Sequence, residues 1–198
     1  RTWTHRGLTE SQMIAAIAVD PRDPNRLFVA VLGHPYGPNP ERGVFRSRDG
    51  GQSFQRVLYK DEYTSANEVL IDPSDPNTLY ATLWQQQESF IEGQAFSGAG
   101  MGIFKSTDRG AHWHQPVLGT NNERPNARQD MRPLSRIGGG DLPTLTVDPK
   151  DPNVIYSASV VMWRTEDGGL SWSAVRGAPG GDDYQRIWIN PNDTKIII

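Results

Sequence analysis

Three octapeptides of one pattern decide the fold of this chain: SRDGGQSF at residues 47–54, STDRGAHW at residues 106–113 and TEDGGLSW at residues 165–172. Each has the form Ser/Thr-x-Asp-x-Gly-x-x-aromatic, and the aspartates are separated by 59 residues in both intervals. In such a turn the aspartate carboxylate can accept backbone N–H bonds, while glycine adopts a positive φ at little cost. The regular spacing predicts three copies of one supersecondary unit.

The motif Asp-Pro-x-Asp-Pro-Asn precedes each octapeptide, at residues 20–25, 72–77 and 148–153, and a degenerate copy (NPND) stands at residues 190–193. Proline presets φ and cannot donate to a strand ladder, and Asp or Asn caps the turn through its side chain. Alternating apolar residues lead into and out of both motifs, as is typical of strands joined by tight turns. Each unit is therefore predicted to hold four antiparallel strands, and such units repeated around an axis form a β-propeller.

The expected fold is all-β: a β-propeller of four-stranded antiparallel blades in an incomplete ring of about three and a half blades. Residues 1–198 form one partial domain, with units at approximately 13–59, 67–118 and 143–176, the start of another at 186–198 and a trailing strand at 3–8. A closed propeller has about four to eight blades. We therefore expect a segment of a longer chain, the rival being a ring closed by association between copies.

The composition argues against several classes of function. The 198 residues include 20 Lys+Arg and 23 Asp+Glu, a net charge of −3, which does not suit a nucleic-acid-binding surface. No apolar run approaches the roughly 20 residues of a membrane-spanning helix, so no membrane span is expected in this segment. The lack of cysteine excludes disulfides, thiolate metal sites and thiol nucleophiles.

The octapeptides resemble the Asp-box, or BNR, repeat of sialidases, sortilin-type propellers and xyloglucanase-like propellers. With the Asp-Pro turns and the strands GVFRS (43–47) and GIFKS (102–106), the chain is most similar to bacterial sortilin-like BNR-repeat proteins, a glycosyl hydrolase-like group. The resemblance covers nearly the whole chain and implies a secreted or periplasmic protein. It implies a fold more than an activity, because this fold hosts enzymes, receptors and scaffolds.

The octapeptide residues are expected to brace turns rather than to catalyse. The aspartate accepts N–H bonds, glycine supplies the positive φ and the aromatic ring packs on the neighbouring sheet. These structural positions are Ser47, Asp49, Gly51, Phe54, Ser106, Asp108, Gly110, Trp113, Thr165, Asp167, Gly169 and Trp172.

In a four-stranded meander the short turns share one face, so the long connections emerge together on the other. Variable loops on a rigid scaffold are where binding usually occurs. Exposed aromatic side chains there can stack on sugar rings or anchor a protein, or can tuck back over the blade edge. If residues 119–141 formed a helix, their arginines would make a cationic stripe. Prolines interrupt this segment, so a solvated loop is favoured. The binding-face candidates are His34, Tyr36, Phe90, Phe96, Arg128, Arg132 and Tyr184.

A glycosidase needs two carboxylates that flank the scissile bond. On the loop face the weak candidates are Asp141, which follows three glycines, and the pair Asp182 and Asp183. Sialidase chemistry is not supported, because the expected early Phe-Arg-Ile-Pro motif is missing. His112 and His114 could be half of a zinc site, but no further ligand is evident, so no metal and no cofactor are expected.

The favoured interpretation is a binding or scaffold module that presents its long loops to a protein or glycan partner, within a larger assembly. The alternative is a glycoside hydrolase that acts on a polysaccharide in the central groove of the propeller. A non-enzymatic role is favoured because the sequence identifies no catalytic pair. Paired carboxylates near the axis would favour the enzyme, whereas a loop face buried against another chain would favour the scaffold.

Overall fold

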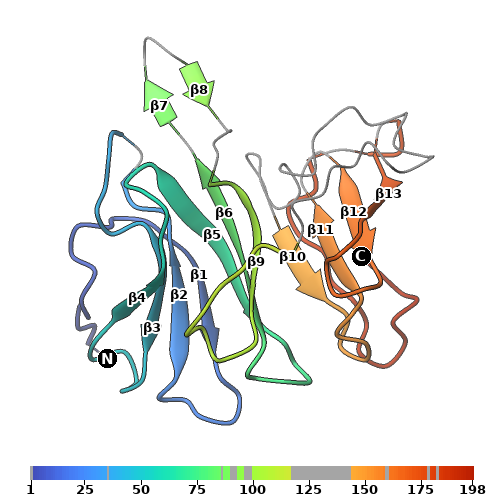
Figure 1. Cartoon of the computed structure of the whole chain (residues 1–198), viewed down its shortest axis with the longest axis horizontal. Coiled ribbons are helices and arrows are strands. Elements are labelled where there is room, and N and C mark those ends of the chain that lie inside the picture. Colours follow the sequence, from blue (N-terminus) through green and yellow to red (C-terminus); the bar gives the residue numbers. More distant parts are fainter. Residues whose placement is uncertain are drawn as a thin grey trace.

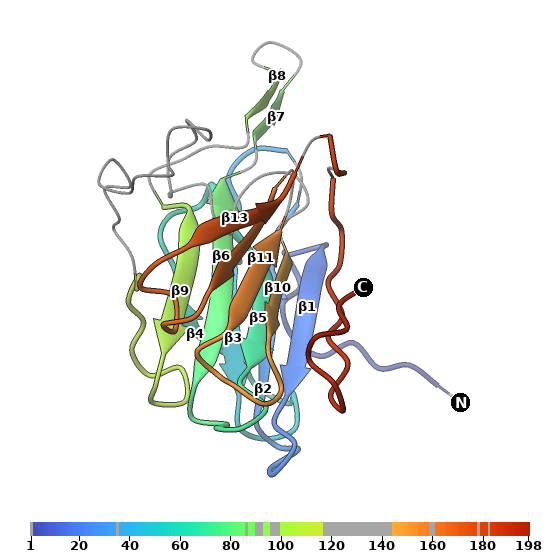
Figure 2. The same ribbon diagram turned by 90° about the vertical axis from the view of Figure 1, so that its right-hand side faces the viewer.

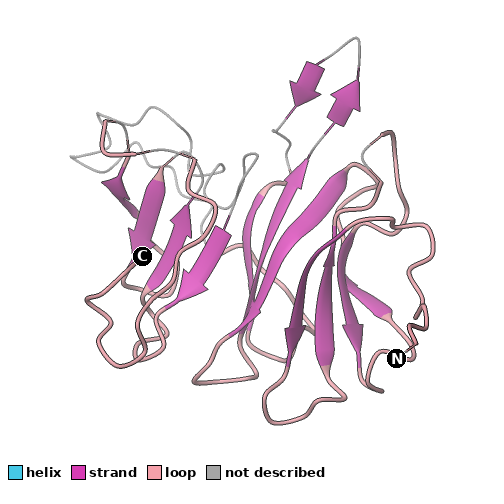
Figure 3. Cartoon of the chain, turned by 180° about the vertical axis from the view of Figure 1, so that it is seen from behind, coloured by secondary structure: helices cyan, strands magenta, loops and turns pink. Residues whose placement is uncertain are grey.

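The computed structural model describes residues 2–34, 36–85, 87–89, 93–95, 100–116, 144–158, 161–177, 179–181 and 183–198. Within these ranges the chain forms strands and turns and no helix (Figure 3). The prediction of an all-β propeller fold with an unclosed set of four-stranded antiparallel sheets is confirmed. No helix in the described part of the chain is long and apolar enough to cross a membrane.

The first sheet follows the chain in the order β1-β2-β3-β4, and every neighbouring pair is antiparallel. Its strands are β1 (Ile14–Val19), β2 (Leu27–Val31), β3 (Gly43–Ser47) and β4 (Gln55–Leu58). The third sheet repeats this order with β10 (Thr144–Val147), β11 (Ile155–Ala158), β12 (Met162–Thr165) and β13 (Ser173–Arg176). In both sheets the Asp-Pro motif joins the first two strands and the octapeptide joins the last two, as its turn chemistry predicts.

The second sheet has three full strands, β5 (Thr64–Ile71), β6 (Leu79–Gln85) and β9 (Gly102–Ser106). In the described residues, the outer strand expected here is represented by one bridge between Lys105 and His114, closed by two N–H···O bonds of 2.8 and 3.0 Å. Between β6 and β9 the chain forms a small separate hairpin of β7 (Gln87–Ser89) and β8 (Gly93–Ala95). In the last described segment, residues 183–198, Ile189 and Ile197 form an isolated bridge.

The trailing strand expected at residues 3–8 is not a strand in the structure. No described strand lies alongside it to pair with its backbone, so residues 2–13 run as irregular chain. Leu8 instead packs with Phe54 against Val29, Val31 and Phe45 of the first sheet. The side chain of Trp3 is fully exposed.

The core lies between consecutive sheets, which stand side by side in Figure 1. Phe28 of β2 packs with Leu79 and Leu83 of β6 in a cluster that joins the first two sheets. Tyr80 of β6 packs with Ile155 of β11 in the next cluster. Because each strand alternates its side chains, one strand serves the cores on both of its faces. Burial of these apolar side chains between sheets is the main stabilising interaction.

The two kinds of short turn lie at one end of the sheets and touch each other. The N–H groups of Gly50, Arg109 and Gly168 donate to the carbonyls of Asn25, Asn77 and Asn153 at 2.9–3.0 Å. The described connection between β2 and β3 and the β7–β8 hairpin lie at the opposite end, as Figures 1 and 2 show. Consequently these described connections are presented on one face, here called the loop face.

Candidate functional site

The octapeptide turns are closed by the same hydrogen bonds in all three units. In the first, Ser47 Oγ accepts from Gly51 N at 2.8 Å, and Asp49 Oδ1 accepts from Gln52 N and Ser53 N at 2.9 Å. The hydroxyl of Ser53 adds a bond to the second oxygen of Asp49 at 2.5 Å, and these bonds hold the pKa of that carboxyl well below its usual range. A carboxylate held ionised in this way cannot serve as a general acid near neutral pH.

The second and third turns repeat this arrangement. Asp108 accepts from the backbone N–H of His112 at 2.9 Å and contacts its imidazole at 2.6 Å, which lowers the pKa of the carboxyl. For Asp167, burial alone would raise the pKa, but hydrogen bonds from Ser171 and Thr165 outweigh it. Stability from such carboxylates is present above their unfolded pKa and is lost as the pH falls through the lower folded value. Their role in the structure is that of turn braces.

The position of Gly110 in the second turn has no room for a side chain. Gly110 has φ 73°, and a Cβ there would lie 2.8 Å from the ring of Phe28 in the preceding sheet. The aromatic residue that ends the motif, Trp113, packs on the same cluster. The turn therefore also forms part of the contact between consecutive sheets.

On the loop face, Arg42 ties two loops together from inside the protein. Its side chain is 2% exposed. One terminal nitrogen donates to Tyr63 O at 3.2 Å and to Ser65 Oγ at 2.8 Å, and the other donates to the carbonyls of His34 and Gly37 at 2.9 and 3.0 Å. Burial lowers the pKa of this guanidinium, and Asp61 partly offsets that effect. The buried arginine fixes the loop 32–42 against the loop 59–63.

The two loops that Arg42 joins carry exposed tyrosines. Tyr36 is 64% exposed, and Tyr59 and Tyr63 are partly exposed on the adjoining loop. The guanidinium of Arg56 lies 3.7 Å from the centre of the Tyr59 ring, which orients that ring. His34 and Tyr36, two of the sequence candidates, thus lie on a loop that Arg42 bonds to the loop of Tyr59 and Tyr63, two tyrosines that are not among those candidates. Tyr59 and Tyr63 stand in the sequence as the ends of YKDEY (59–63), a segment that is hard to tell from an ordinary polar turn.

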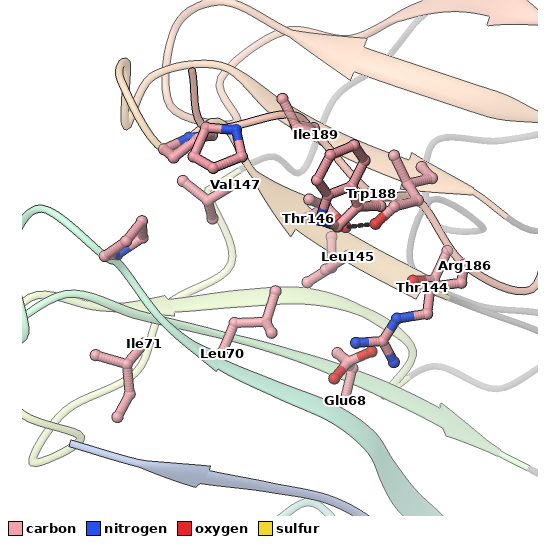
Figure 4. A pocket seen from close by; sticks show the side chains of 14 residues that line it. Glu68, Leu70, Ile71, Thr144, Leu145, Thr146, Val147, Arg186, Trp188 and Ile189 are labelled. Carbon is pink, nitrogen blue, oxygen red and sulfur yellow. Dashed lines mark hydrogen bonds between the residues drawn. The ribbon is translucent and has the colours of Figure 1, made fainter. Parts of the chain in front are cut away.

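A cavity of about 380 Å³ lies where the innermost strands of consecutive units approach one another. Its walls come from β5, from β10 and from residues 186–191, and Figure 4 shows their side chains. Glu68 projects from β5, Arg186 projects from the opposite wall and Thr144, at the start of β10, lies near Arg186. Away from this polar end the walls are mainly apolar and include Leu70, Ile71, Leu145, Val147, Ile187 and Ile189.

A bulge in β5 accounts for the position of Glu68. The register between β5 and β6 shifts between Ala66 and Glu68, which leaves Asn67 as the extra residue. The amide oxygen of Asn67 accepts from Thr82 Oγ1 at 2.7 Å, which holds the bulge in place. A bulge changes the direction of the side chains that follow it, and Glu68 is the residue directly after this one.

Among the described residues, Glu68 is the carboxyl group whose pKa is raised into the neutral range. Burial raises its pKa to about 7, against the smaller opposing effects of Arg186 and of the Val69 N–H. A carboxyl with such a pKa exists in both forms near neutral pH, so it can donate or accept a proton. Among the described residues that line the cavity, Glu68 is the one carboxylate, so a two-carboxylate mechanism needs a second from elsewhere.

The remaining sequence candidates are placed as follows. Asp183 is exposed with φ 52°, away from the residues that line the cavity. Tyr184 is half-buried against Tyr156 and Ile187, and its buried hydroxyl finds no partner among the described residues. Six candidates lie outside the described residues: Asp141, Asp182, Phe90, Phe96, Arg128 and Arg132. The described part of the chain contains no cluster of three His, Asp or Glu residues suited to a metal ion.

Two curated proteins are similar to this chain over most of its length. Xyloglucanase Xgh74A of Acetivibrio thermocellus is 26% identical over 190 residues, which cover 85% of this chain and 20% of that protein. A probable oligoxyloglucan-reducing end-specific xyloglucanase of Neosartorya fischeri is 27% identical over 192 residues, which cover 91% and 20%. The chain spans about a fifth of the length of these relatives. No protein-family model matches it.

Among solved structures, an ancestral GH74 enzyme superposes with a TM-score of 0.69 at 21% identity, covering 96% of this chain and 22% of that one. At this identity the likeness concerns the fold alone. Together these comparisons support a propeller of the xyloglucanase type that is glycoside hydrolase-like. They fit the hydrolase alternative better than the binding or scaffold interpretation favoured from the sequence.

Proposed function

We propose that this chain forms part of a glycoside hydrolase-type propeller that recognises xyloglucan or a related neutral polysaccharide. The observation that carries the proposal is the similarity to two xyloglucanases over 85% and 91% of the chain. The octapeptides further favour membership of the sortilin-like BNR-repeat group, and a polysaccharide substrate outside the cell agrees with secretion.

The loop face is the surface that we assign to the polysaccharide. Its tyrosines present flat, amphipathic rings, and such side chains supply large contact area at a low cost in conformational entropy. The buried bonds of Arg42 hold Tyr36 and Tyr63 on loops with fixed carbonyls. A rigid, aromatic surface of this kind suits a long neutral chain, whose sugar hydroxyls need polar partners at the rim.

The test uses the purified protein on insoluble and soluble polysaccharides. Retention on immobilised xyloglucan, with release of new reducing ends, is expected, and retention on xylan or pullulan is not. Tyr36→Ala and Tyr63→Ala should weaken retention about five- to thirtyfold each, since hot-spot aromatics contribute about 1–2 kcal/mol. Leu170→Ala is the matched control, because Leu170 is 66% exposed in an octapeptide turn on the opposite face.

Two results would count against the proposal. Neither retention nor hydrolysis of xyloglucan by the purified protein would overturn it altogether. Retention without any release of reducing ends would overturn the hydrolase part and would return the chain to the binding-module interpretation. In that case a protein partner on the loop face becomes the next candidate.

A further inference from the structure

Three consecutive units place a polar side chain at one shared position ahead of the Asp-Pro turn. Glu68, Thr144 and Arg186 each lie four residues ahead of the first Asp or Asn of their Asp-Pro turn. All three line the same cavity, where the innermost strands of neighbouring units converge. The repeat that builds the fold therefore also assembles a carboxyl, a hydroxyl and a guanidinium around one space.

The carboxyl and the guanidinium face each other across this space without closing on each other. In Figure 4 the guanidinium of Arg186 points toward the carboxylate of Glu68. Among the ion pairs and hydrogen bonds of the described residues, none joins these two side chains. An acceptor and a set of donors thus remain directed into the cavity, which is the arrangement that a ligand hydroxyl can satisfy from both sides.

The rest of the cavity is apolar and carries an indole on its wall. Trp188 is 49% exposed and lines the cavity on the wall from which Arg186 also comes. Leu70 and Ile71 of β5 form part of the apolar wall. The volume, about 380 Å³, falls in the range of about 300–1,000 Å³ that small-molecule sites have.

We propose that this cavity is a saccharide-binding subsite that takes a neutral pyranose unit, stacked on Trp188 and hydrogen-bonded by Glu68 and Arg186. A pyranose presents an apolar face of C–H groups and an equatorial rim of hydroxyls. The indole and the aliphatic side chains match the face, and the Glu68–Arg186 pair matches the rim, because a hydroxyl both donates and accepts. The assignment to sugars rests on the proposed function, since the relatives that support it are polysaccharide-degrading enzymes.

The charges of the cavity select a neutral sugar over an acidic one. A uronic acid that paired with Arg186 would bring its carboxylate toward Glu68, and like charges at close range disfavour binding. A cationic sugar that paired with Glu68 would bring its positive charge toward Arg186, and this repulsion likewise disfavours binding. The burial that raises the pKa of Glu68 to about 7 lets this carboxyl either donate to or accept from a neutral hydroxyl near neutral pH.

The experiment is a calorimetric titration of the purified protein with cellobiose, glucose and glucuronic acid. Trp188→Ala, Glu68→Gln and Arg186→Met are each expected to weaken cellobiose binding about tenfold, as for a lost buried hydrogen bond or stacking contact. Trp3→Ala is the control for loss of a tryptophan, because Trp3 is fully exposed and is not among the residues that line the cavity. Near-ultraviolet circular dichroism and thermal melts establish whether each variant remains folded. If Trp188→Ala does not fold, Glu68→Gln still tests the subsite, because glutamine preserves the shape of the glutamate side chain.

The outcomes separate this inference from the proposed function. Cellobiose binding that is lost in the cavity variants and kept in Trp3→Ala supports the subsite. A flat cellobiose titration in a protein that still binds xyloglucan overturns the subsite alone, and so does preferential binding of glucuronic acid. Cellobiose binding that depends on Trp188 in a protein without xyloglucan recognition supports the subsite and overturns the proposed function. Absence of both interactions overturns both.

Discussion

At the scale of single residues, two kinds of carboxylate respond to pH in opposite directions. The octapeptide aspartates have lowered pKa values because backbone and side-chain donors surround them, so they stabilise the fold except in acid. Glu68 has a pKa raised from 4.5 to about 7 because it is buried in the cavity. Its folded state holds the proton more tightly than the unfolded state, so stability falls as the pH rises from about 4.5 to 7.

Glu68→Gln is therefore expected to remove this loss of stability. The charged group that faces Glu68 from the neighbouring segment is Arg186, while β10 contributes the uncharged Thr144. Urea unfolding at pH 5 and pH 8 should show a smaller difference between the two pH values for the variant than for the wild-type protein. Glu62→Gln, at an exposed loop position, is the control and should keep the wild-type difference. Equal differences in all three proteins would mean that Glu68 does not titrate in this range.

Residue-scale prediction from sequence succeeds where a turn requires one residue type and fails where geometry decides. The octapeptide pattern identifies Asp49 as a turn residue because few side chains can accept two neighbouring N–H groups. Glu68 carries no such signal, since its direction depends on the bulge at Asn67, and its partner lies more than a hundred residues away in the chain. Arg42 is missed for a related reason, because an arginine beside a strand is usually exposed.

At the scale of elements, the strands and short turns are predictable and the long loops are not. The order β1-β2-β3-β4 follows from alternation of apolar residues and from the two turn motifs. The shape of residues 32–42 instead depends on Arg42, which donates to the carbonyl of Tyr63, 21 residues further along the chain. Such long-range bonds have no counterpart in local sequence patterns.

Arg42→Met tests whether one buried arginine holds both loops. Loss of its donors leaves the carbonyls of His34, Gly37 and Tyr63 without their partner, so both loops should open while the sheets persist. Hydrogen exchange at Asn39 N, which donates to Glu62 O at 2.9 Å across the two loops, should speed up at least tenfold, the effect of about 1.4 kcal/mol. Arg6→Met, at an exposed position, should leave this exchange unchanged. Unchanged protection in Arg42→Met would show that the loops hold without it.

At the scale of the whole molecule, the cores that join consecutive sheets make the sheets depend on one another. Leu79 is fully buried in β6 and contributes to the cluster shared by the first and second sheets, while the adjacent Tyr80 contributes to the cluster shared by the second and third. In repeat architectures stability is carried by such nearest-neighbour contacts. A defect in one cluster should therefore reach both neighbouring sheets.

Leu79→Ala is expected to lower the free energy of unfolding by about 2–5 kcal/mol, the range for a leucine deleted from a packed core. Leu170→Ala, whose side chain is 66% exposed, should change it by less than about 0.5 kcal/mol. Hydrogen exchange shows whether the sheets unfold together or separately, because the amides of β2 report on the first sheet and those of β11 on the third. If the sheets unfold together, both sets lose protection by the same factor in Leu79→Ala. Protection that falls in β2 while β11 keeps its wild-type value would show that the third sheet unfolds on its own, and that the cluster around Tyr80 is too weak to couple it.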